Sequence, residues 1–153
     1  MKTFYLAHAA SKMDEIREWQ LEFQKRNPRI RFHNPFFEGK EAPEIQKVKQ
    51  GVITRQQHIL RSNWKEYVDD DIASVFASDG VVCNFWDEGA HSIGTPCEMM
   101  WAFIFHKPIY VIADGFRSEN HWFIKYTGAQ IFTSRKKFEE FIAEQYEYEG
   151  IYA

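Results

Sequence analysis

The sequence predicts an α/β fold, a doubly wound parallel sheet of five strands with helices on both faces. Three observations support this prediction. Short apolar segments alternate with segments of helical periodicity along the chain. The segment 80–85 is almost wholly apolar, as expected of a strand that is covered on both faces. The length of 153 residues suits a single domain, 1–153, with room for a substantial core.

Five segments have the short, apolar character of strands. They lie at 4–7, 30–32, 80–85, 109–112 and 130–132. The second segment, Ile30-Arg31-Phe32, alternates apolar and polar residues, which favours a position nearer an edge of the sheet. This alternation of strands and helices predicts the flavodoxin-like class of doubly wound folds.

The first helix follows the first strand. Ser11 with Asp14 is expected to open it, and Asn27-Pro28 to end it. Its apolar positions recur at helical spacing and are Met13, Ile16, Trp19 and Phe23.

The middle of the chain is predicted as a loop and then a helical region. The loop covers 34–43 and carries Phe36 and Phe37, and the helical region runs from about 43 to 77 with an interruption near Gly51. At about 100° per residue, the apolar face of this region comprises Leu60, Trp64, Tyr67, Val68, Ile72 and Val75.

Three further helices complete the prediction. One begins at Pro96 and is closed by His106-Lys107-Pro108, and a short one lies at about 120–126. Ser134 is expected to cap the last helix. The residues of this last helix that face inward are expected to be Phe138, Phe141 and Ile142.

The composition excludes several classes of function. The net charge is −3 with both signs interspersed, so no nucleic acid and no membrane is expected as a partner. Aromatic residues make up 17% of the chain, which favours an aromatic-rich core and a protein interface. Cys83 and Cys97 are expected to be reduced and buried, in a cytoplasmic protein. The six histidines lack ligand spacing and partner cysteines, so no structural metal is expected. No organic cofactor is expected either.

The segment 92–98, Ser-Ile-Gly-Thr-Pro-Cys-Glu, is the most informative part of the sequence. It is a polar turn at the carboxyl end of the third strand, where ligands bind in open α/β sheets, and it leads into a helix. Glu98 in the first turn of that helix is therefore a candidate for chemistry. The alternative is plain capping, with Thr95 as N-cap and Glu98 bonding back to the Thr95 amide.

A second carboxylate lies on the helix that precedes the third strand. Asp71 falls near the middle of the apolar face, whereas Asp69 and Asp70 point away from it. A charge in such a place needs a partner or a cleft. In the alternative, the helix ends near Asp69 and all three aspartates lie in a solvated turn. An inward Asp71 would share a crevice with Glu98, an arrangement suited to attack at an anomeric carbon.

These residues resemble the nucleoside 2-deoxyribosyltransferase family, including its relatives that hydrolyse deoxynucleoside monophosphates. The resemblance runs over most of the chain. It is carried by the segments Phe4-Tyr5-Leu6-Ala7, Asp71-Ile72, 78–82, Gly94-Thr95 with Glu98, Lys107-Pro108 and 148–152. The G-T-x-x-E element also resembles the motif of phosphoribohydrolases that release cytokinins.

The resemblance implies a role for several residues. Glu98 would attack C1′ of a deoxyribose, Asp71 would manage the proton of the departing and incoming bases, and Tyr5 would orient Glu98. On its own, Tyr5 reads equally as a buried strand tyrosine. Asn120 matches a position that reaches the sugar bound by a neighbouring subunit, which implies a homo-oligomer.

The remaining candidates would bind substrate. Gly94 belongs to the turn, and Phe36, Phe37 and Trp86 are candidates to stack on the base, although for each of these aromatics taken singly a place in the core or at the rim is favoured over ligand contact. Ser92 stands where the transferases usually carry an aspartate and the monophosphate hydrolases a serine. The ending at 148–152 resembles the transferases instead, so the two signals conflict.

The expected function is cleavage of the N-glycosidic bond of a 2′-deoxynucleoside through a deoxyribosyl-Glu98 intermediate, with transfer of the sugar to a free nucleobase. The first alternative is a hydrolase of deoxynucleoside 5′-monophosphates. The second is a non-catalytic nucleotide-sensing module, because fold does not fix function. The nucleoside is preferred because the ending at 148–152 resembles the transferases and because no arginine or lysine flanks the turn at 92–98.

Overall fold

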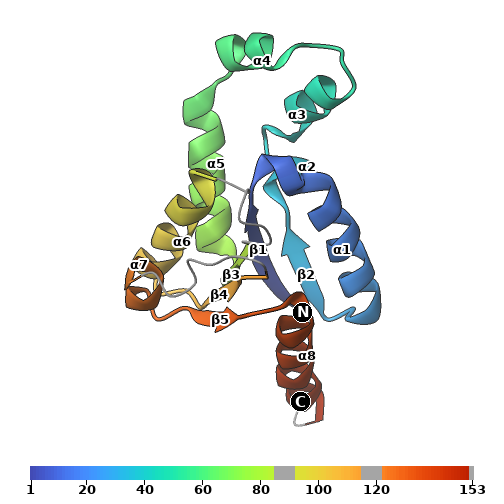
Figure 1. The fold of residues 1–153 in the computed structure, drawn as a ribbon, viewed down its shortest axis with the longest axis vertical. Coiled ribbons are helices and arrows are strands. Elements are labelled where there is room, and N and C mark those ends of the chain that lie inside the picture. The colour runs from blue at the N-terminus through green and yellow to red at the C-terminus, as the bar shows by residue number, and fades with distance from the viewer. Residues whose placement is uncertain (85–91, 115–121, 152–153) are drawn as a thin grey trace.

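The computed structural model describes residues 1–84, 92–114 and 122–151, with only the backbone of 123 and 147–151. Its strands form one parallel sheet in the order β2-β1-β3-β4-β5 (Figure 1). The strands are β1 Lys2–His8, β2 Ile30–His33, β3 Gly80–Asn84, β4 Ile109–Ile112 and β5 Gln130–Phe132. The predicted flavodoxin-like α/β fold is confirmed, and β2 is at an edge as expected.

Helices cover both faces of the sheet. Their bounds are η1 Ala10–Lys12, α1 Met13–Arg26, α2 Pro35–Glu38, α3 Ala42–Lys49, α4 Arg55–Arg61, α5 Trp64–Ala77, α6 Gly94–Ile104, α7 Trp122–Tyr126 and α8 Arg135–Ile151. Ser134 caps α8 as predicted, because its hydroxyl accepts the Lys137 N–H at 3.2 Å. At the other end of the chain, Ser11 lies within η1, and α1 begins without a side-chain cap.

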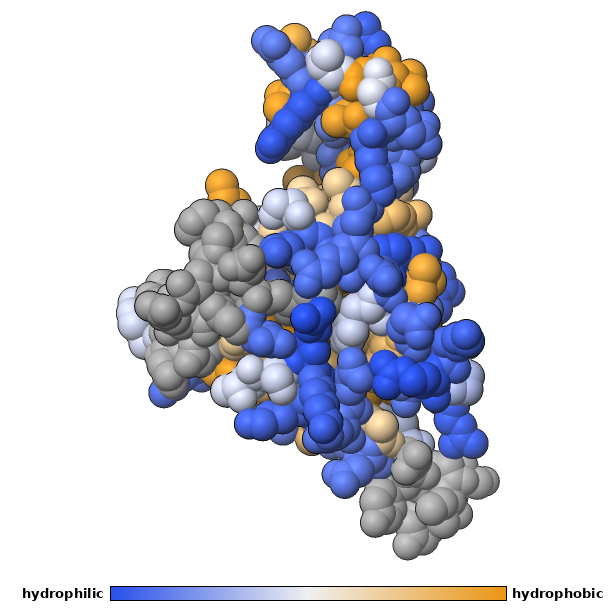
Figure 2. Space-filling model, turned by 45° about the vertical axis from the view of Figure 1, so that its right-hand side comes forward, coloured by the Kyte–Doolittle hydropathy of each residue, from blue (hydrophilic) through white to orange (hydrophobic). Residues whose placement is uncertain are grey.

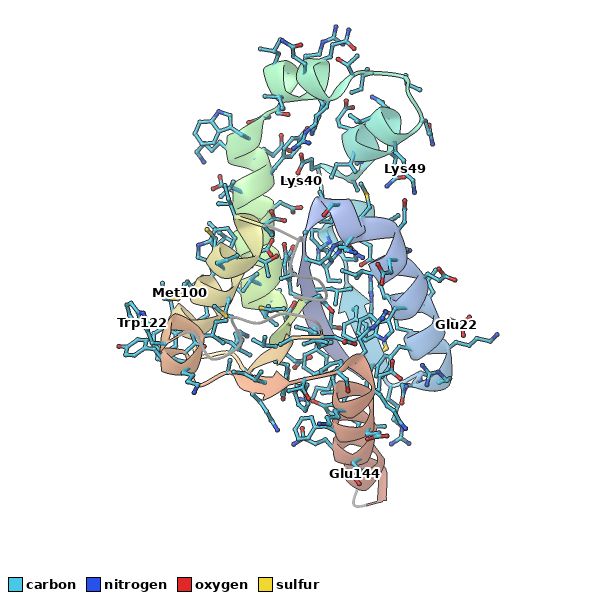
Figure 3. All side chains as sticks on the ribbon, in the orientation of Figure 1. Glu22, Lys40, Lys49, Met100, Trp122 and Glu144 are labelled. Carbon is cyan, nitrogen blue, oxygen red and sulfur yellow. The ribbon has the colours of Figure 1, made fainter. Side chains whose placement is uncertain are left out.

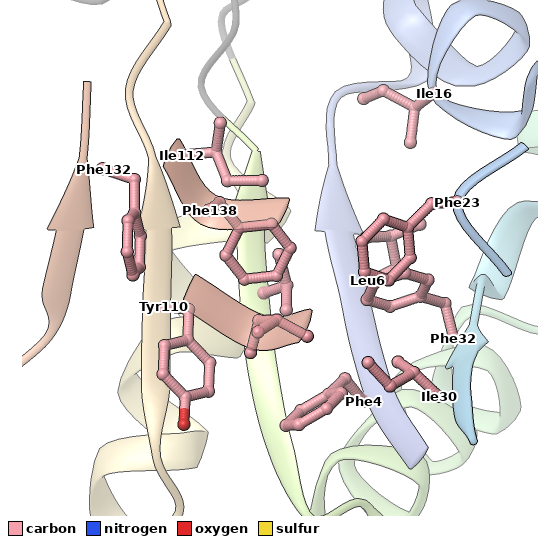
Figure 4. Packing of buried hydrophobic residues seen from close by; sticks show 12 residues of the cluster. Phe4, Leu6, Ile16, Phe23, Ile30, Phe32, Tyr110, Ile112, Phe132 and Phe138 are labelled. Carbon is pink, nitrogen blue, oxygen red and sulfur yellow. The ribbon is translucent and has the colours of Figure 1, made fainter. Parts of the chain in front are cut away.

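Alternate strand residues divide the core into two layers. One cluster joins the strands to α1 and α8 and contains Phe4, Leu6, Ile16, Phe23, Ile30, Phe32, Val82, Tyr110, Ile112, Phe132, Phe138 and Ile142 (Figure 4). The other joins the opposite face to α5, α6 and α7 and includes Tyr5, Ala7, Val75, Val81, Cys83, Met99, Ala102 and Val111. Tyr5 and Glu98 therefore lie on the same side of the sheet.

The region predicted as a loop at 34–43 contains the short helix α2. Asn34 begins this helix because its side chain accepts the Phe36 N–H, and Pro35 occupies the first turn. The helical region that follows is interrupted near Gly51 as predicted, where the glycine adopts φ +73°. A second interruption, at Ser62-Asn63, separates α4 from α5.

Residues 40–63, with α3 and α4, form an arm that extends beyond the carboxyl edge of the sheet (Figure 1). Because of this arm, the apolar face predicted for the helical region from Leu60 to Val75 is wrong in part. Leu60 and Trp64 are 78% and 72% exposed, because the break at Ser62 interrupts the helical phase and the start of α5 lies above the sheet. Figure 2 shows apolar side chains gathered on the arm. Val75, farther along α5, is fully buried.

The two cysteines differ in their surroundings. Cys83 is buried in β3, but Cys97 is exposed, so the prediction that both are buried is wrong for Cys97. Cys97 follows Pro96 in the first turn of α6 and faces away from the sheet, unlike Thr95 and Glu98, which are buried. In the described part of the chain, no helix is long and apolar enough to cross a membrane.

Candidate active site

A cavity of about 380 Å³ opens at the carboxyl edge of the sheet, where β1 and β3 lie side by side. This is the point at which the strand order reverses, since the chain passes from β1 outward to β2 and then back across to β3. Helices on opposite faces diverge there and leave a crevice. The cavity is lined by His8, Ala10, Pro35, Phe36, Gly39, Lys40, Glu41, Arg55, Tyr67, Asp70, Asp71, Ser92, Ile93, Gly94 and Glu98.

Three of the predicted residues meet beside this cavity: Asp71 and Glu98 line it, and Tyr5 is buried next to them. The Tyr5 hydroxyl donates a hydrogen bond of 2.7 Å to Glu98 Oε1. Asp71 interacts with the same hydroxyl from α5, which continues to Ala77 instead of ending near Asp69. Tyr5 is fully buried, and its ring stacks on His33 of β2 with centroids 5.7 Å apart, so the hydroxyl is held in place.

Burial is the main cause of the shifted pKa values of Glu98, Asp71 and Tyr5. Removal from water raises the pKa of Glu98 to about 8, while the hydrogen bond from Tyr5 opposes the rise and the charge of Asp71 adds to it. Burial likewise raises the pKa of Asp71 to about 6, opposed by its hydrogen bond with Tyr5. Burial and the two carboxylates hold the pKa of Tyr5 far above its usual value, so Tyr5 remains a hydrogen-bond donor at any physiological pH.

Glu98 does not cap its own helix. The predicted capping box at Thr95 is wrong, because α6 begins at Gly94 with Ile93 as N-cap, and the Glu98 carboxyl bonds to Tyr5. Ser92 supports the start of the helix instead, since its Oγ accepts the Thr95 N–H at 3.1 Å and the Thr95 hydroxyl at 3.0 Å. Glu98 is only 8% exposed and is left to face the cavity.

The predicted substrate-binding residues fall into three groups. Ser92, Gly94 and Phe36 line the cavity, and a Cβ added at Gly94 would meet open space. Phe37 is not among the lining residues, and its ring contacts the Arg17 guanidinium at 4.7 Å. Trp86 and Asn120 lie outside the described residues.

The arm contributes cations that the sequence interpretation missed. Lys40 donates its backbone N–H to Asp70 Oδ2 at 2.8 Å, and its ammonium lies 3.5 Å from Glu66, so the arm is tied to α5 (Figure 3). Arg55 begins α4 and also lines the cavity. No carboxylate within the described ranges pairs with its guanidinium. Local periodicity holds no signal for these positions, because only the fold of the arm brings them to the cavity.

Asp70 and His8 were also missed. Asp70 lines the cavity and does not point away from it, because the bond to Lys40 closes the arm over that side of α5. His8 ends β1 and is 3% exposed. Its position at the carboxyl end of a predicted strand was a usable signal, because the ligand crevice forms there.

The chain matches no family model and no curated protein. Solved structures share its fold. A conserved protein from Enterococcus faecalis V583 matches with a TM-score of 0.63 and 14% identity, over 95% of this chain and 99% of its own. The CMP N-glycosidase BcmB from Clostridium botulinum matches with a TM-score of 0.51 and 14% identity, over 93% of this chain and 99% of its own. The protein therefore shares an architecture on which an N-glycosidase has been built.

Proposed function

We propose that the protein cleaves the N-glycosidic bond of a 2′-deoxynucleoside, with Glu98 as the nucleophile, and passes the sugar to a second nucleobase. The observation that carries this proposal is that Asp71 and Glu98 line one cavity at the carboxyl edge of the sheet and both interact with the buried Tyr5 hydroxyl. The cavity volume of about 380 Å³ lies within the range of small-molecule sites.

Cleavage would proceed in two displacements. The ionised Glu98 carboxylate bonds to C1′ as the bond from C1′ to the base nitrogen breaks, and protonated Asp71 supplies the proton that the departing base takes up. The incoming base then attacks C1′, gives its proton to Asp71 and releases Glu98. Two inversions give net retention at C1′.

Tyr5 would act on the nucleophile without touching the sugar. Its hydrogen bond fixes Glu98 Oε1, which leaves Oε2 as the oxygen free to approach C1′. The same bond stabilises the ionised form of Glu98 against the effect of burial. Tyr5 is therefore a positioning residue in this proposal.

A second candidate is hydrolysis of a deoxynucleoside 5′-monophosphate. It is supported by Lys40 and Arg55, which line the cavity although no basic residue flanks Ser92 in sequence. The sequence-based reason for preferring a nucleoside is weakened accordingly. The similarity in fold to a protein named a CMP N-glycosidase also favours this candidate.

One experiment separates these activities. The purified protein is incubated with a deoxynucleoside, with its 5′-monophosphate, and with each in the presence of a different free base, and the products are separated by chromatography. A new nucleoside supports transfer, free sugar or sugar phosphate supports hydrolysis, and no cleavage of any substrate would favour the non-catalytic module. We also propose a homo-oligomer, and sedimentation of only an 18.2 kDa species with full activity would contradict it.

A further inference from the structure

His8 occupies an unusual position for a buried histidine. It ends β1, lines the cavity and is 3% exposed, and its ring packs against Phe36 with centroids 4.8 Å apart. Both ring nitrogens face oxygen atoms. Nε2 lies 3.0 Å from Asn34 Oδ1, and Nδ1 lies 3.2 Å from the Ala9 carbonyl oxygen.

The orientation of the Asn34 amide is fixed by its other contacts. Asn34 Oδ1 accepts the Phe36 backbone N–H at 3.3 Å, so the atom facing His8 is an oxygen. Asn34 Nδ2 donates to Gln20 Oε1 at 3.0 Å, and this oxygen also accepts from Arg17 at 3.2 Å. Gln20 Nε2 donates to the Phe32 carbonyl at 3.2 Å, which sets the Gln20 amide as well.

A neutral imidazole cannot satisfy both of the oxygens that face His8. It carries a single N–H, so one nitrogen lone pair must oppose an oxygen, whereas the imidazolium donates from both nitrogens. Burial acts in the other direction and lowers the pKa of His8, because the ring is removed from water. The hydrogen-bond geometry therefore favours the charged form and the desolvation opposes it.

A counter-ion beside His8 would resolve this conflict. Among the described residues, the charged side chains that line the cavity are Lys40, Glu41, Arg55, Asp70, Asp71 and Glu98, while Arg17 contacts Gln20 and Glu38 contacts the Asn34 N–H. Across the described ranges, none of the carboxylates among them makes a hydrogen bond or ion pair with His8. Glu41 pairs instead with His58 at 2.7 Å, and Asp70 with the Lys40 N–H.

We infer that an anionic group, a phosphate monoester or a free oxyanion, binds in the cavity beside His8, and that His8 takes up a proton as it binds. The proton comes from solvent and adds to the ring nitrogen that lacks one, so both nitrogens then donate to their oxygens. It returns to solvent when the anion leaves. The identity of the ligand that carries the anion rests on the proposed function, but the coupling of anion and proton does not.

Sulfate is the probe that tests this coupling, because its charge is constant over the range in which histidine titrates. Nitrogen-labelled protein is titrated with sulfate near neutral pH, and the ring ¹⁵N signals of His8 are followed. We expect them to move to the imidazolium position. We also expect the sulfate affinity to fall about tenfold per pH unit where free His8 is neutral and bound His8 is charged. Exposed His106 is the control and should stay unchanged.

Two variants sharpen the test. Asn34→Asp supplies a carboxylate next to Nε2, so His8 should be an imidazolium without any anion. His8→Gln cannot take up a proton, so its sulfate affinity should be weaker and lose the His8-dependent fall with pH. Circular dichroism checks that each variant is folded, and the wild-type titration decides the outcome if either is not.

The source of the anion is identified with the inactive Glu98→Ala variant. A response of His8 to a deoxynucleoside 5′-monophosphate but not to sulfate assigns a phosphate carried by the substrate, and a response to sulfate alone assigns a free anion. Both support the inference. If His8 stays neutral at saturating concentrations of both, or if neither binds, the inference is overturned, while cleavage of nucleosides by Glu98 is judged by its own assay.

Discussion

The hydroxyl of Tyr5 lies 2.7 Å from Glu98 Oε1, although 93 residues separate the two in the chain. The contact forms because Tyr5 faces the side of the sheet that α6 covers, and because α6 starts directly beyond the carboxyl edge of β3. A single hydrogen bond thereby aims one carboxylate oxygen and leaves the other open to the cavity. Most of the expected behaviour of the site follows from this arrangement.

Glu98→Ala is expected to abolish cleavage while the fold remains intact, because Glu98 caps no helix and, among the described residues, its carboxyl is hydrogen-bonded by Tyr5 alone. In the wild-type protein without an acceptor base, a 2′-fluoro-arabino nucleoside should leave one sugar attached to Glu98, since fluorine destabilises the oxocarbenium-like transition state through which the intermediate is released. Intact-protein mass spectrometry measures the adduct. Undiminished turnover by Glu98→Ala would rule out Glu98 as the nucleophile.

Asp71→Asn should keep the fold but slow the departure of the base. The loss in kcat/KM should be largest for bases that leave poorly, and of the order of 10²–10⁴-fold, as for removal of a general acid. The matched control is Asp69→Asn, because Asp69 is exposed and pairs with Lys65, whereas Asp70 lines the cavity. Equal losses at Asp69 and Asp71 would mean that Asp71 has no catalytic role.

The pH dependence of kcat/KM should be bell-shaped, with limbs near 6 and 8 set by the pKa values of Asp71 and Glu98. Cleavage needs ionised Glu98 and protonated Asp71. Because Asp71 has the lower pKa of the two, only about 1% of the molecules carry this combination between the two limbs. Tyr5→Phe removes the hydrogen bond that opposes the rise of the Glu98 pKa, so the alkaline limb should move to higher pH. Tyr110→Phe, on the opposite face of the sheet, is the control and should leave both limbs in place.

Glu98→Gln should stabilise the protein at alkaline pH. The pKa of Glu98 is about 8 in the folded protein against an ordinary value of 4.5, so the unfolded chain ionises first and wild-type stability falls as pH rises from 4.5 toward 8. Glutamine avoids this loss and can still accept from Tyr5. Thermal unfolding should show no difference in Tm at acidic pH and a difference that grows up to pH 8 and is constant above it. A constant difference at all pH values would contradict the raised pKa.

Ser92 and Arg55 should decide between nucleoside and 5′-monophosphate. A carboxylate about 4 Å from a phosphate opposes it by roughly 1–4 kcal/mol, so Ser92→Asp should lower kcat/KM for the monophosphate by about one to three decades. Aspartate can still accept the Thr95 N–H, so α6 should form. Arg55→Gln should lower kcat/KM for the monophosphate but not for the nucleoside. Arg61→Gln on the same helix is its control. If both variants keep the wild-type preference between nucleoside and monophosphate, the proposed site does not bind phosphate.

The strands, the doubly wound class and the two candidate carboxylates could be predicted from the amino-acid sequence. Each of these follows from patterns within one segment, such as the apolar run at 80–85 or the position of Glu98 behind a strand-ending turn. The break at Ser62-Asn63 was not apparent, because the apolar spacing of Leu60 and Trp64 continues across it as if one helix were present.

Which side chains share the cavity could not be predicted in this way, because it depends on the three-dimensional fold. The bond between Tyr5 and Glu98, the approach of Lys40 and Arg55, and the two oxygens that face His8 all join elements far apart in the chain. Periodicity reports which face of a segment is buried, but the neighbour that a buried side chain meets depends on the strand order and on the path of each crossover. That is why Glu98 could be identified from its local pattern, whereas its hydrogen-bond donor and its pKa required the fold.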